Sequence, residues 1–423
     1  MGEPDEILIV GGGLAGLRCA ALLEAAGARY RLFEASDGWG GRVRTDRQAD
    51  GFLLDRGFQV FLTAYPEARP LFDYGALRLG GFLPGARVRA GGRFHRVSDP
   101  WRDPNNLGAT LRADVGTLAD KMRIGLFRHG VCRGTADTPW RGADRSALGE
   151  LRARGFSETM IERFFRPFFG GIFLDPELAT SARMMCFVFR MFSQGEATLP
   201  AEGIGSLSDQ LAGRLDPDRI HLHRPVVRVR PDGIVLADGR ELSGSAVVLA
   251  VDPRSAARLR GLTEPPMRGT AVVYFAAERS PLDEPVLVLN GEGAGPVNTL
   301  AVLTDVQPGY SPDHRSLIAV SVIRHAGTLD SPAGLRAVRD QLTRWFGHDP
   351  VSGWRHLATC SVPEALPVQE PGHLVPGELP VVTEEGLYVC GDYRESGSLN
   401  GALASGRRAG EAVLARLSGE GRL

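Results

Sequence analysis

The sequence predicts an α/β fold in which a domain built on a parallel sheet is interrupted by an inserted α+β region. Three observations lead to this prediction. A strand, a glycine-rich turn, a helix and a second strand follow one another over residues 7–34. A strand and a long helix close the chain over 387–417, and the residues between the two ends follow a different pattern. The 423 residues also suffice for two or three domains of about 150 residues each.

The opening elements follow from the apolar pattern. Residues 7–10 (Ile-Leu-Ile-Val) form a continuous apolar run, which is typical of a strand buried on both faces of a parallel sheet. Apolar side chains then recur at helical spacing over 14–26, and Gly27 is suited to end that helix. Residues 30–34 form the next strand. Because the connections are short, we expect a right-handed β-α-β crossover with adjacent strands.

The middle of the chain has two parts with different hydrophobic patterns. Its first part has helical spacing, and its second part has alternating runs separated by Asp-Gly turns, which favour hairpins. The predicted helices cover 108–130, 145–170, 176–193 and 332–346, and the predicted strands lie within 225–251 and at 270–277, 286–289, 299–303 and 317–323. A last strand at 387–390 and a helix of about 401–417 end the chain.

Composition excludes several classes of protein. The 49 basic and 50 acidic side chains give a net charge of −1, which provides no field to hold a nucleic acid. The five cysteines form no Cys-x-x-Cys pair and no metal-ligand spacing, so we expect free thiols, a reducing compartment and no metal site. The acidic N-terminus resembles no targeting peptide, and no apolar run approaches about 18 residues. A cytoplasmic protein is therefore expected.

The first turn carries the pattern of a phosphate-binding loop. Gly11 permits a tight turn, Gly13 lets the backbone approach a pyrophosphate, and Gly16 lets the helix pack on the strand. Leu14 and Ala15 begin the helix, whose free N–H groups and positive dipole end attract phosphate. This arrangement predicts a Rossmann-type dinucleotide-binding domain.

Glu34 adds a second dinucleotide signal at the end of the next strand, with Ala35 beside it. A carboxylate at this place accepts hydrogen bonds from a ribose and repels a 2′-phosphate.

The following segment resembles the flavin amine oxidase superfamily, which includes monoamine oxidases, protoporphyrinogen oxidases and phytoene desaturases. Residues 38–45 (Gly-Trp-Gly-Gly-Arg-Val-Arg-Thr) are similar to its GGRxxT stretch, so Gly41 and Arg42 are implied to contact a pyrophosphate. Residues 55–59 (Asp-Arg-Gly-Phe-Gln) resemble its D-x-G stretch, in which backbone passes along the flavin ring. That resemblance assigns Gly57, Phe58 and Gln59 to FAD.

The C-terminal residues resemble the closing motif of the same family. Gly391 and Asp392 follow the last strand, and the resemblance implies that Asp392 holds the ribitol or a phosphate. The next helix would point its N-terminus at the flavin pyrimidine, which stabilises the anionic reduced ring. The implied contacts on this helix are Ser398, Leu399, Asn400 and Ala402. The hairpins of 225–251 resemble the middle FAD segment, where Val227 meets the adenine.

The resemblance implies the domain organisation. Residues 1–60, 200–265 and 370–423 would form the FAD-binding domain. Residues 61–199, largely helical, and 266–369, rich in sheet, would form the inserted substrate domain. Because no cysteine occupies the usual place of covalent attachment, we expect FAD to be bound noncovalently.

Two departures from the family concern the substrate. Lys121 is the last lysine of the chain, whereas monoamine-type oxidases place a lysine near the flavin. Ser398 stands where those enzymes tend to carry a tyrosine. Residues 156–192 alternate phenylalanines with arginines. One interpretation is a helical core with arginines reaching outward, and the other is an apolar substrate tunnel with a basic rim that rests peripherally on a membrane.

We therefore predict an FAD-dependent oxidoreductase that removes hydride from a hydrophobic small molecule, as desaturases and protoporphyrinogen oxidases do, and passes electrons to O2 or a quinone. The alternatives are an amine oxidase acting on a C–N bond and an FAD-binding scaffold without turnover. No side chain is assigned as catalytic, since flavin N5 is the reactive centre. The choice among a polyene, a tetrapyrrole and an amine stays open, as does the oligomeric state.

Overall fold

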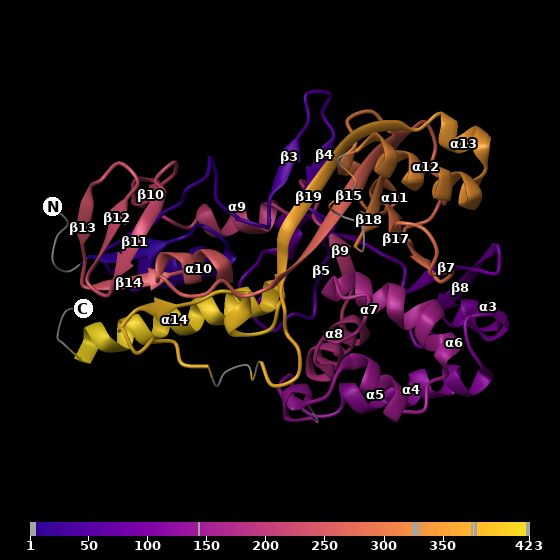
Figure 1. Cartoon of the computed structure of the whole chain (residues 1–423), viewed down its shortest axis with the longest axis horizontal. Coiled ribbons are helices and arrows are strands. Elements are labelled where there is room, and N and C mark those ends of the chain that lie inside the picture. The colour runs from indigo at the N-terminus through magenta and orange to yellow at the C-terminus, as the bar shows by residue number, and fades with distance from the viewer. Residues whose placement is uncertain are drawn as a thin grey trace.

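A parallel five-stranded sheet forms the first layer of the molecule (Figure 1), whose computed structural model describes residues 6–142, 144–323, 327, 329, 331–373, 375 and 379–419. Residues 1–5 and 420–423 of the predicted FAD domain lie outside this description. The strands, in spatial order, are β10 (Ile220–His221), β2 (Tyr30–Phe33), β1 (Ile7–Val10), β14 (Ala246–Leu249) and β20 (Tyr388–Val389). Because β1 lies at the centre, all four of its side chains are buried, which explains its continuous apolar run.

Helices cover one face of this sheet, and a small antiparallel sheet covers the other. The helices are α1 (Leu14–Ala25), α9 (Ser206–Ala212) and α14 (Leu399–Gly419), and α10 (Pro253–Leu259) lies beside the small sheet. The small sheet consists of β11 (Val226–Arg230), β12 (Gly233–Leu236) and β13 (Glu241–Ser243). Helices α1 and α14 approach closely, since a Cβ on Gly406 would lie 2.3 Å from the carbonyl oxygen of Ala15. This is the predicted Rossmann-type arrangement.

A mixed seven-stranded sheet forms the second part (Figure 1). Its order is β19 (Arg355–Pro367), β15 (Met267–Ala277), β18 (Ser316–Val322), β17 (Val297–Val302), β16 (Leu287–Asn290), β7 (Gly85–Ala90) and β8 (Arg93–Ser98). Helices α12 (Pro332–Phe346) and α13 (His348–Ser352) pack on one face, and the short α11 (Leu303–Val306) follows β17. The pairing is antiparallel except between β16 and β7.

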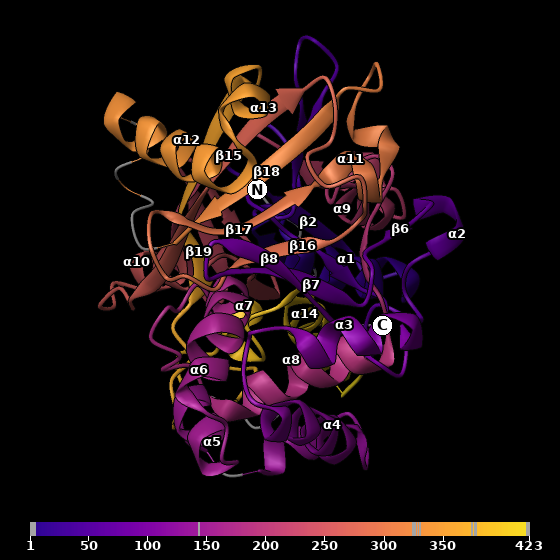
Figure 2. The same cartoon turned by 90° about the vertical axis from the view of Figure 1, so that its right-hand side faces the viewer.

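A group of helices lies against the second sheet on the side opposite α12 (Figure 2). It contains α3 (Leu107–Arg112), α4 (Leu118–Cys132), α5 (Ala147–Ala153), α6 (Glu158–Met160), a π-helical turn (Ile161–Phe165), α7 (Arg166–Phe173) and α8 (Ala182–Gln194). Smaller elements are α2 (Tyr74–Leu77), β3 (Thr45–Arg47), β4 (Leu53–Asp55), β5 (Phe61–Leu62), β6 (Gly80–Gly81) and β9 (Ala197–Leu199). No helix among these described elements is both long and apolar enough to span a bilayer.

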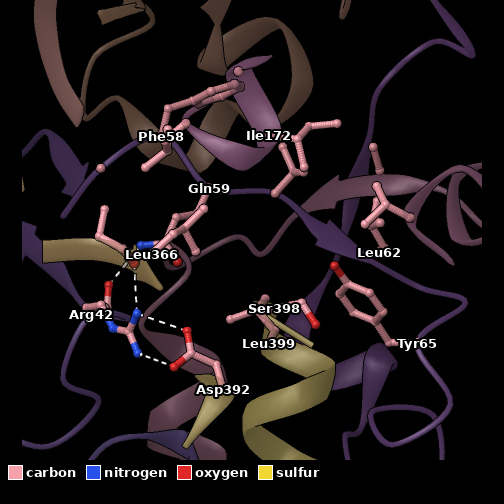
Figure 3. A pocket seen from close by; sticks show the side chains of 18 of the residues that line it. Arg42, Phe58, Gln59, Leu62, Tyr65, Ile172, Leu366, Asp392, Ser398 and Leu399 are labelled. Carbon is pink, nitrogen blue, oxygen red and sulfur yellow. Dashed lines mark hydrogen bonds and ion pairs between the residues drawn. The ribbon is translucent and has the colours of Figure 1, made fainter. Parts of the chain in front are cut away.

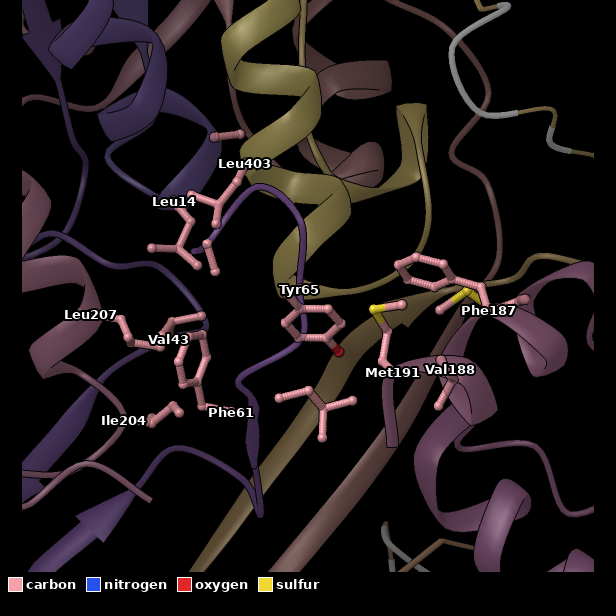
Figure 4. Packing of buried hydrophobic residues seen from close by; sticks show 14 of the residues in the cluster. Leu14, Val43, Phe61, Tyr65, Phe187, Val188, Met191, Ile204, Leu207 and Leu403 are labelled. Atoms are coloured by element: carbon pink, nitrogen blue, oxygen red, sulfur yellow. The ribbon is translucent and has the colours of Figure 1, made fainter. Parts of the chain in front are cut away.

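The hydrophobic core runs without a break from the parallel sheet to the helical group (Figure 4). Tyr65 stacks on Phe187 of α8 with ring centroids 6.3 Å apart, and its other side meets Phe61 edge-on at 6.4 Å. These contacts join α8 to the segment around β5.

Three sequence predictions about the middle of the chain are corrected here. The helix expected over 145–170 is broken between α5 and α6, where Ser157 caps a new helix start. The helix expected over 108–130 is interrupted, because Thr117 and Asp120 form a reciprocal capping box that starts α4 anew. The helix expected from residue 176 begins only at Ala182, after the N-cap Ser181. The sequence analysis also missed β7, β8 and β19. In β7 the inward positions hold small or branched residues and the outward ones arginine, a period-two signal.

Candidate FAD and substrate site

A cavity of about 1270 Å³ lies between the parallel sheet, the mixed sheet and the helical group. The predicted cofactor residues come together along it, although they are far apart in sequence. Those that line it are Gly11, Gly13, Leu14, Ala15, Glu34, Ala35, Gly41, Arg42, Gly57, Phe58, Gln59, Val227, Gly391, Asp392, Ser398, Leu399 and Ala402. Gly16 and Asn400 are not among the lining residues.

The glycine-rich turn places each glycine as its role requires. Gly11 has φ +108°, and a Cβ there would lie 2.6 Å from the carbonyl oxygen of Ala250. A Cβ on Gly16 would lie 2.0 Å from the carbonyl oxygen of Gly11, so Gly16 serves helix packing and does not face the cavity. A Cβ on Gly13 would meet no described atom within 4 Å, because that position faces the open cavity.

Glu34 lies at the carboxyl end of β2, where two backbone N–H groups hold its carboxylate. The N–H of Gly12 donates to Oε2 at 2.7 Å and that of Ser36 donates to Oε1 at 2.8 Å. Val227 reaches the same end of the cavity from β11, where the register shifts between Val226 and Arg228. Such a bulge turns a side chain out of the regular alternation, and Val227 is 56% exposed.

Arg42 and Asp392 form a bidentate ion pair at the middle of the cavity (Figure 3). Arg42 donates from Nη2 to Oδ1 at 2.7 Å and from Nη1 to Oδ2 at 2.9 Å. Nη1 also donates to the carbonyl oxygen of Ala365 at 2.8 Å. Burial disfavours the guanidinium, yet the neighbouring Asp392 raises the pKa of Arg42, so this side chain stays cationic. The sequence had assigned both residues to the cofactor without anticipating that they pair.

The 57–59 stretch is tied to the same pair. Gly57 has φ +96°, and Nε2 of Gln59 donates to the carbonyl oxygen of Arg42 at 2.8 Å. Asp55, just before it, is buried and accepts hydrogen bonds from Thr45 Oγ1 at 2.6 Å, Tyr310 Oη at 2.7 Å and the Ile204 N–H at 3.0 Å. Burial raises the pKa of Asp55 to about 6, although these hydrogen bonds favour the carboxylate.

We expect Asp55 to make stability depend on pH. Its pKa in the unfolded chain is about 3.9, so the native state holds a proton that the unfolded state has lost at intermediate pH. Asp55 therefore contributes about 3 kcal/mol to the free energy of unfolding below about pH 4, and this contribution is lost as pH rises through about 6. Urea unfolding at several pH values measures it. The Asp55→Asn variant, which cannot titrate, should lack this component, and an identical pH dependence in both proteins would contradict the assignment.

The N-terminus of α14 faces the cavity, which Ser398, Leu399 and Ala402 line. Ser398 caps the helix, since its Oγ accepts from the Gly401 N–H at 3.1 Å, and the first turn holds no acidic residue. Asn400 is the exception among the predicted contacts on this helix. Its Oδ1 accepts a hydrogen bond from the N–H of Glu67 at 3.0 Å, so its side chain is used to hold the 67 loop.

These features fit a dinucleotide carrying a flavin. The N-termini of α1 and α14 both face the cavity, and neither first turn carries an acidic side chain that would oppose a phosphate. Gly13 leaves space that any side chain would fill, and Arg42 supplies a cation beside it. None of the cysteines (Cys19, Cys132, Cys186, Cys360 and Cys390) lines the cavity.

The rest of the cavity is a mostly apolar chamber, and the phenylalanines of the Phe-rich segment divide between this chamber and the core. One face of the helices turns four phenylalanines into the core, and the opposite face turns four toward the chamber. The core set is Phe165, Phe169, Phe173 and Phe187, and the chamber set is Phe164, Phe168, Phe189 and Phe192. The π-helical turn at 161–165 precedes α7, and the rings of Phe164 and Phe168 stack at 5.6 Å.

The arginines of that segment form no rim, which corrects the second interpretation. Arg190 is buried and donates to the carbonyl oxygens of Val131, Arg133 and Gly134 at the C-terminal end of α4. The other three arginines, Arg163, Arg166 and Arg183, pair with acids or carbonyls, and none of them lines the cavity.

Several lining residues were not predicted. The mixed sheet contributes Thr270, Leu287, Thr299, Ser321, Val362 and Leu366, and the segments around β5 contribute Leu62, Tyr65 and Phe82. Lys121 also lines the cavity, but its Nζ donates to the carbonyl oxygens of Leu111 and Ala113 at 2.7 and 2.8 Å. The apolar run of β15 is continuous and buried after Gly269, so it gives no signal for the position of Thr270, and no local pattern points to Leu62 or Tyr65.

The chain is similar to known proteins. A sequence model described as "Flavin containing amine oxidoreductase" matches residues 14–414. Coproporphyrinogen III oxidase of Propionibacterium freudenreichii subsp. freudenreichii is 28% identical over 88% of this chain and 86% of that protein. The 15-cis-phytoene desaturase of an Oncidium hybrid cultivar is 40% identical over 38% of this chain and 25% of that protein. The structure of an oxidoreductase from Methanosarcina mazei matches with a TM-score of 0.75 at 18% identity, covering 96% of this chain and 100% of that one.

Proposed function

Because the chain belongs to the flavin-containing amine oxidoreductase family and is an FAD-dependent oxidoreductase, we propose that it dehydrogenates a hydrophobic substrate by a desaturase-like or porphyrinogen-oxidase-like reaction. FAD is bound noncovalently in this proposal, and O2 or a quinone takes up the electrons. The observation that carries the proposal is the apolar chamber beside the predicted FAD contacts.

The chamber wall supports an apolar substrate over a small polar amine. The lining residues of α7, α8 and the π-helical turn, all within the described part of the chain, include no charged side chain. The family's usual flavin-side lysine has no counterpart after Lys121, and Lys121 itself is held by two backbone carbonyls. Burial lowers the pKa of Lys121, but its ammonium is already used as a hydrogen-bond donor.

In this proposal the chain's own residues bind, orient and exclude water. Bound FAD supplies a hydride acceptor. The N–H groups at the start of α1 and the Arg42 guanidinium would hold its phosphates, and Glu34 would hold a ribose. Gln59 fixes the backbone of Arg42 and so keeps the 57–59 stretch in place. The phenylalanines of the chamber set keep the reacting region dry and position an apolar molecule.

Anaerobic bleaching of the visible flavin absorbance tests the proposal. The holoenzyme is mixed with a carotenoid, a porphyrinogen, a primary amine or a polyamine, and dithionite serves as the control for reducible flavin. We expect bleaching by an apolar compound and none by the amines. Bleaching by an amine alone would overturn the proposal in favour of C–N oxidation.

A matched pair of variants tests the chamber itself. Ile172 of α7 lines it and is only partly buried, so a change there need not disturb the core. Ile172→Glu places a charge in the chamber and should slow bleaching by the apolar compound at least about tenfold, because the carboxylate must be desolvated by the substrate. Ile172→Met keeps the wall apolar and should retain the rate. Both variants should bind FAD and be reduced by dithionite.

A further inference from the structure

The exposed large apolar side chains of the described residues are unevenly distributed. Of the nine that the structure shows, six lie on or beside α3 and α4, and the other three, Val227, Leu262 and Val382, lie apart. We call these six residues the α3–α4 crest: Trp101, Leu107, Leu111, Leu118, Met122 and Leu126. The crest lies in the helical group, at the opposite end of the molecule from the chain termini (Figure 1). A contiguous apolar surface of this kind marks an interaction site.

The crest residues of each helix lie in a row along one face of that helix. Leu118, Met122 and Leu126 repeat every four residues along α4, while Phe127 and Val131 on the opposite face are buried. Leu118 is 59% exposed and Leu126 72% exposed, so neither contributes to the core. Leu107 and Leu111 form a second row of the same spacing on α3.

Trp101 joins these rows. The Arg128 guanidinium lies 4.9 Å from the centre of its ring, and a Cβ on Gly125 would lie 2.8 Å from the edge of the indole. The tryptophan is therefore held over α4 while more than half of it stays exposed.

The crest is continuous with the cavity. Trp101, Leu107, Leu111 and Met122 belong to the lining residues, whereas Leu118 and Leu126 extend the apolar surface outward. A molecule that enters across the crest meets mostly apolar side chains, with the charged Asp99, Arg102, Lys121 and Arg128 beside them, before it reaches the chamber set of phenylalanines. This geometry suits a substrate that arrives from an apolar phase.

The charge around the crest favours an anionic surface. Residues 99–133 carry six arginines and lysines against four aspartates, whereas the whole chain has a net charge of −1. Asp99 pairs with Arg128 at 3.4 Å, Asp120 with Arg123 at 3.5 Å, and Arg102 with Glu196 outside the segment at 3.7 Å, while Arg112 and Arg133 are exposed. Apolar side chains flanked by arginines and lysine are the composition of interfacial membrane-binding helices.

We propose that the α3–α4 crest docks the protein on an anionic lipid bilayer, so that the substrate passes from the membrane into the cavity. The proposal rests on the proposed function for the nature of the substrate, but the docking itself does not depend on turnover. Its occupant is a lipid surface, and a second copy of the chain is an alternative that the test below distinguishes.

Cosedimentation of the holoenzyme with vesicles tests the docking. Vesicles of phosphatidylglycerol and phosphatidylcholine are compared with vesicles of phosphatidylcholine alone. We expect binding to the anionic vesicles that weakens as salt rises, since screening acts on the basic flank. The Leu118→Ser/Leu126→Ser variant should bind at least about tenfold more weakly, because two leucines no longer enter the interface. The Leu262→Ser/Val382→Ser variant, which changes two exposed apolar residues elsewhere (47% and 42% exposed), should bind as the parent does.

The outcomes separate this proposal from the previous one. Absence of vesicle binding, or equal losses in the two variants, overturns the docking. A parent dimer in analytical ultracentrifugation that Leu118→Ser/Leu126→Ser converts to a monomer, without vesicle binding, assigns the crest to a second copy. Flavin bleaching by substrate dispersed in detergent should be unchanged in Leu118→Ser/Leu126→Ser, since neither leucine lines the cavity. If no apolar compound bleaches the flavin of the parent protein, the proposed function is overturned, but the docking is not.

Discussion

A Gly13→Val variant is expected to fold as the parent does and to purify without FAD. Gly13 has φ −74° and ψ 177°, a conformation that valine adopts, and its Cβ would meet no described atom within 4 Å. The isopropyl group would instead fill the space at the N-terminus of α1. We expect FAD affinity to fall about 100-fold, which corresponds to about 3 kcal/mol of steric conflict. Flavin absorbance per protein and circular dichroism of the purified protein measure the two effects.

Two further glycines calibrate that result. Gly130→Val on α4 also adds a side chain where no described atom lies within 4 Å, but Gly130 does not line the cavity, so this variant should retain FAD. Gly11→Ala should impair folding itself, since Gly11 has φ +108° and its Cβ would lie 2.6 Å from the Ala250 carbonyl oxygen. If Gly13→Val retained full flavin, the phosphate site would not lie at the start of α1.

The Asp392→Ala variant is expected to lose both FAD and stability. The carboxylate of Asp392 is buried and accepts two hydrogen bonds from Arg42, whose remaining partner would be the carbonyl of Ala365. Removing one member of a buried pair leaves an uncompensated charge. We expect the free energy of unfolding to fall by about 2–3 kcal/mol. This loss is smaller than for a fully enclosed pair, because 33% of the Arg42 side chain is exposed. Urea unfolding of the flavin-free proteins measures this loss.

Matched substitutions separate the charge from the shape. Asp392→Asn keeps the side-chain volume and one acceptor for Arg42, so it should lower the free energy of unfolding by less than Asp392→Ala does. Asp238 pairs with Arg240 at 2.7 Å on the surface, and Asp238→Ala should change neither flavin content nor stability measurably. An Asp392→Ala protein with full flavin and unchanged stability would show that the Arg42–Asp392 pair serves neither purpose.

The family, the α/β fold and the class of enzyme were predictable from the sequence and are confirmed. The signals responsible are local, namely the glycine-rich turn, the apolar run of β1 and the Gly391-Asp392 turn. The alternative of a flavin-binding scaffold without turnover gains no support, because the relatives are oxidases and desaturases by name. The assignment of individual FAD contacts and of the domain boundaries stays a prediction.

Elements of the inserted region were harder to predict. Strand β19 spans 355–367 and contains Pro363 and Pro367, which weaken a local strand signal although the pairing with β15 stabilises it. The break between α3 and α4 depends on the capping box of Thr117 and Asp120, which competes with continued helical spacing. The apolar pattern alone left both structures ambiguous. The pairing with β15 decided the first, and the capping box decided the second.

The sequence by itself determined the parts of this protein whose chemistry depends on neighbours along the chain. A glycine-rich turn between a strand and a helix brings backbone N–H groups and the positive end of a helix dipole together wherever it folds, because both are built into that turn. The tertiary structure alone decided which residues meet across long separations. It paired Arg42 with Asp392, divided the phenylalanines of 156–192 between core and chamber, and left the α3–α4 crest exposed. The reason is physical, since burial and pairing depend on the packing of distant elements, which no local pattern encodes.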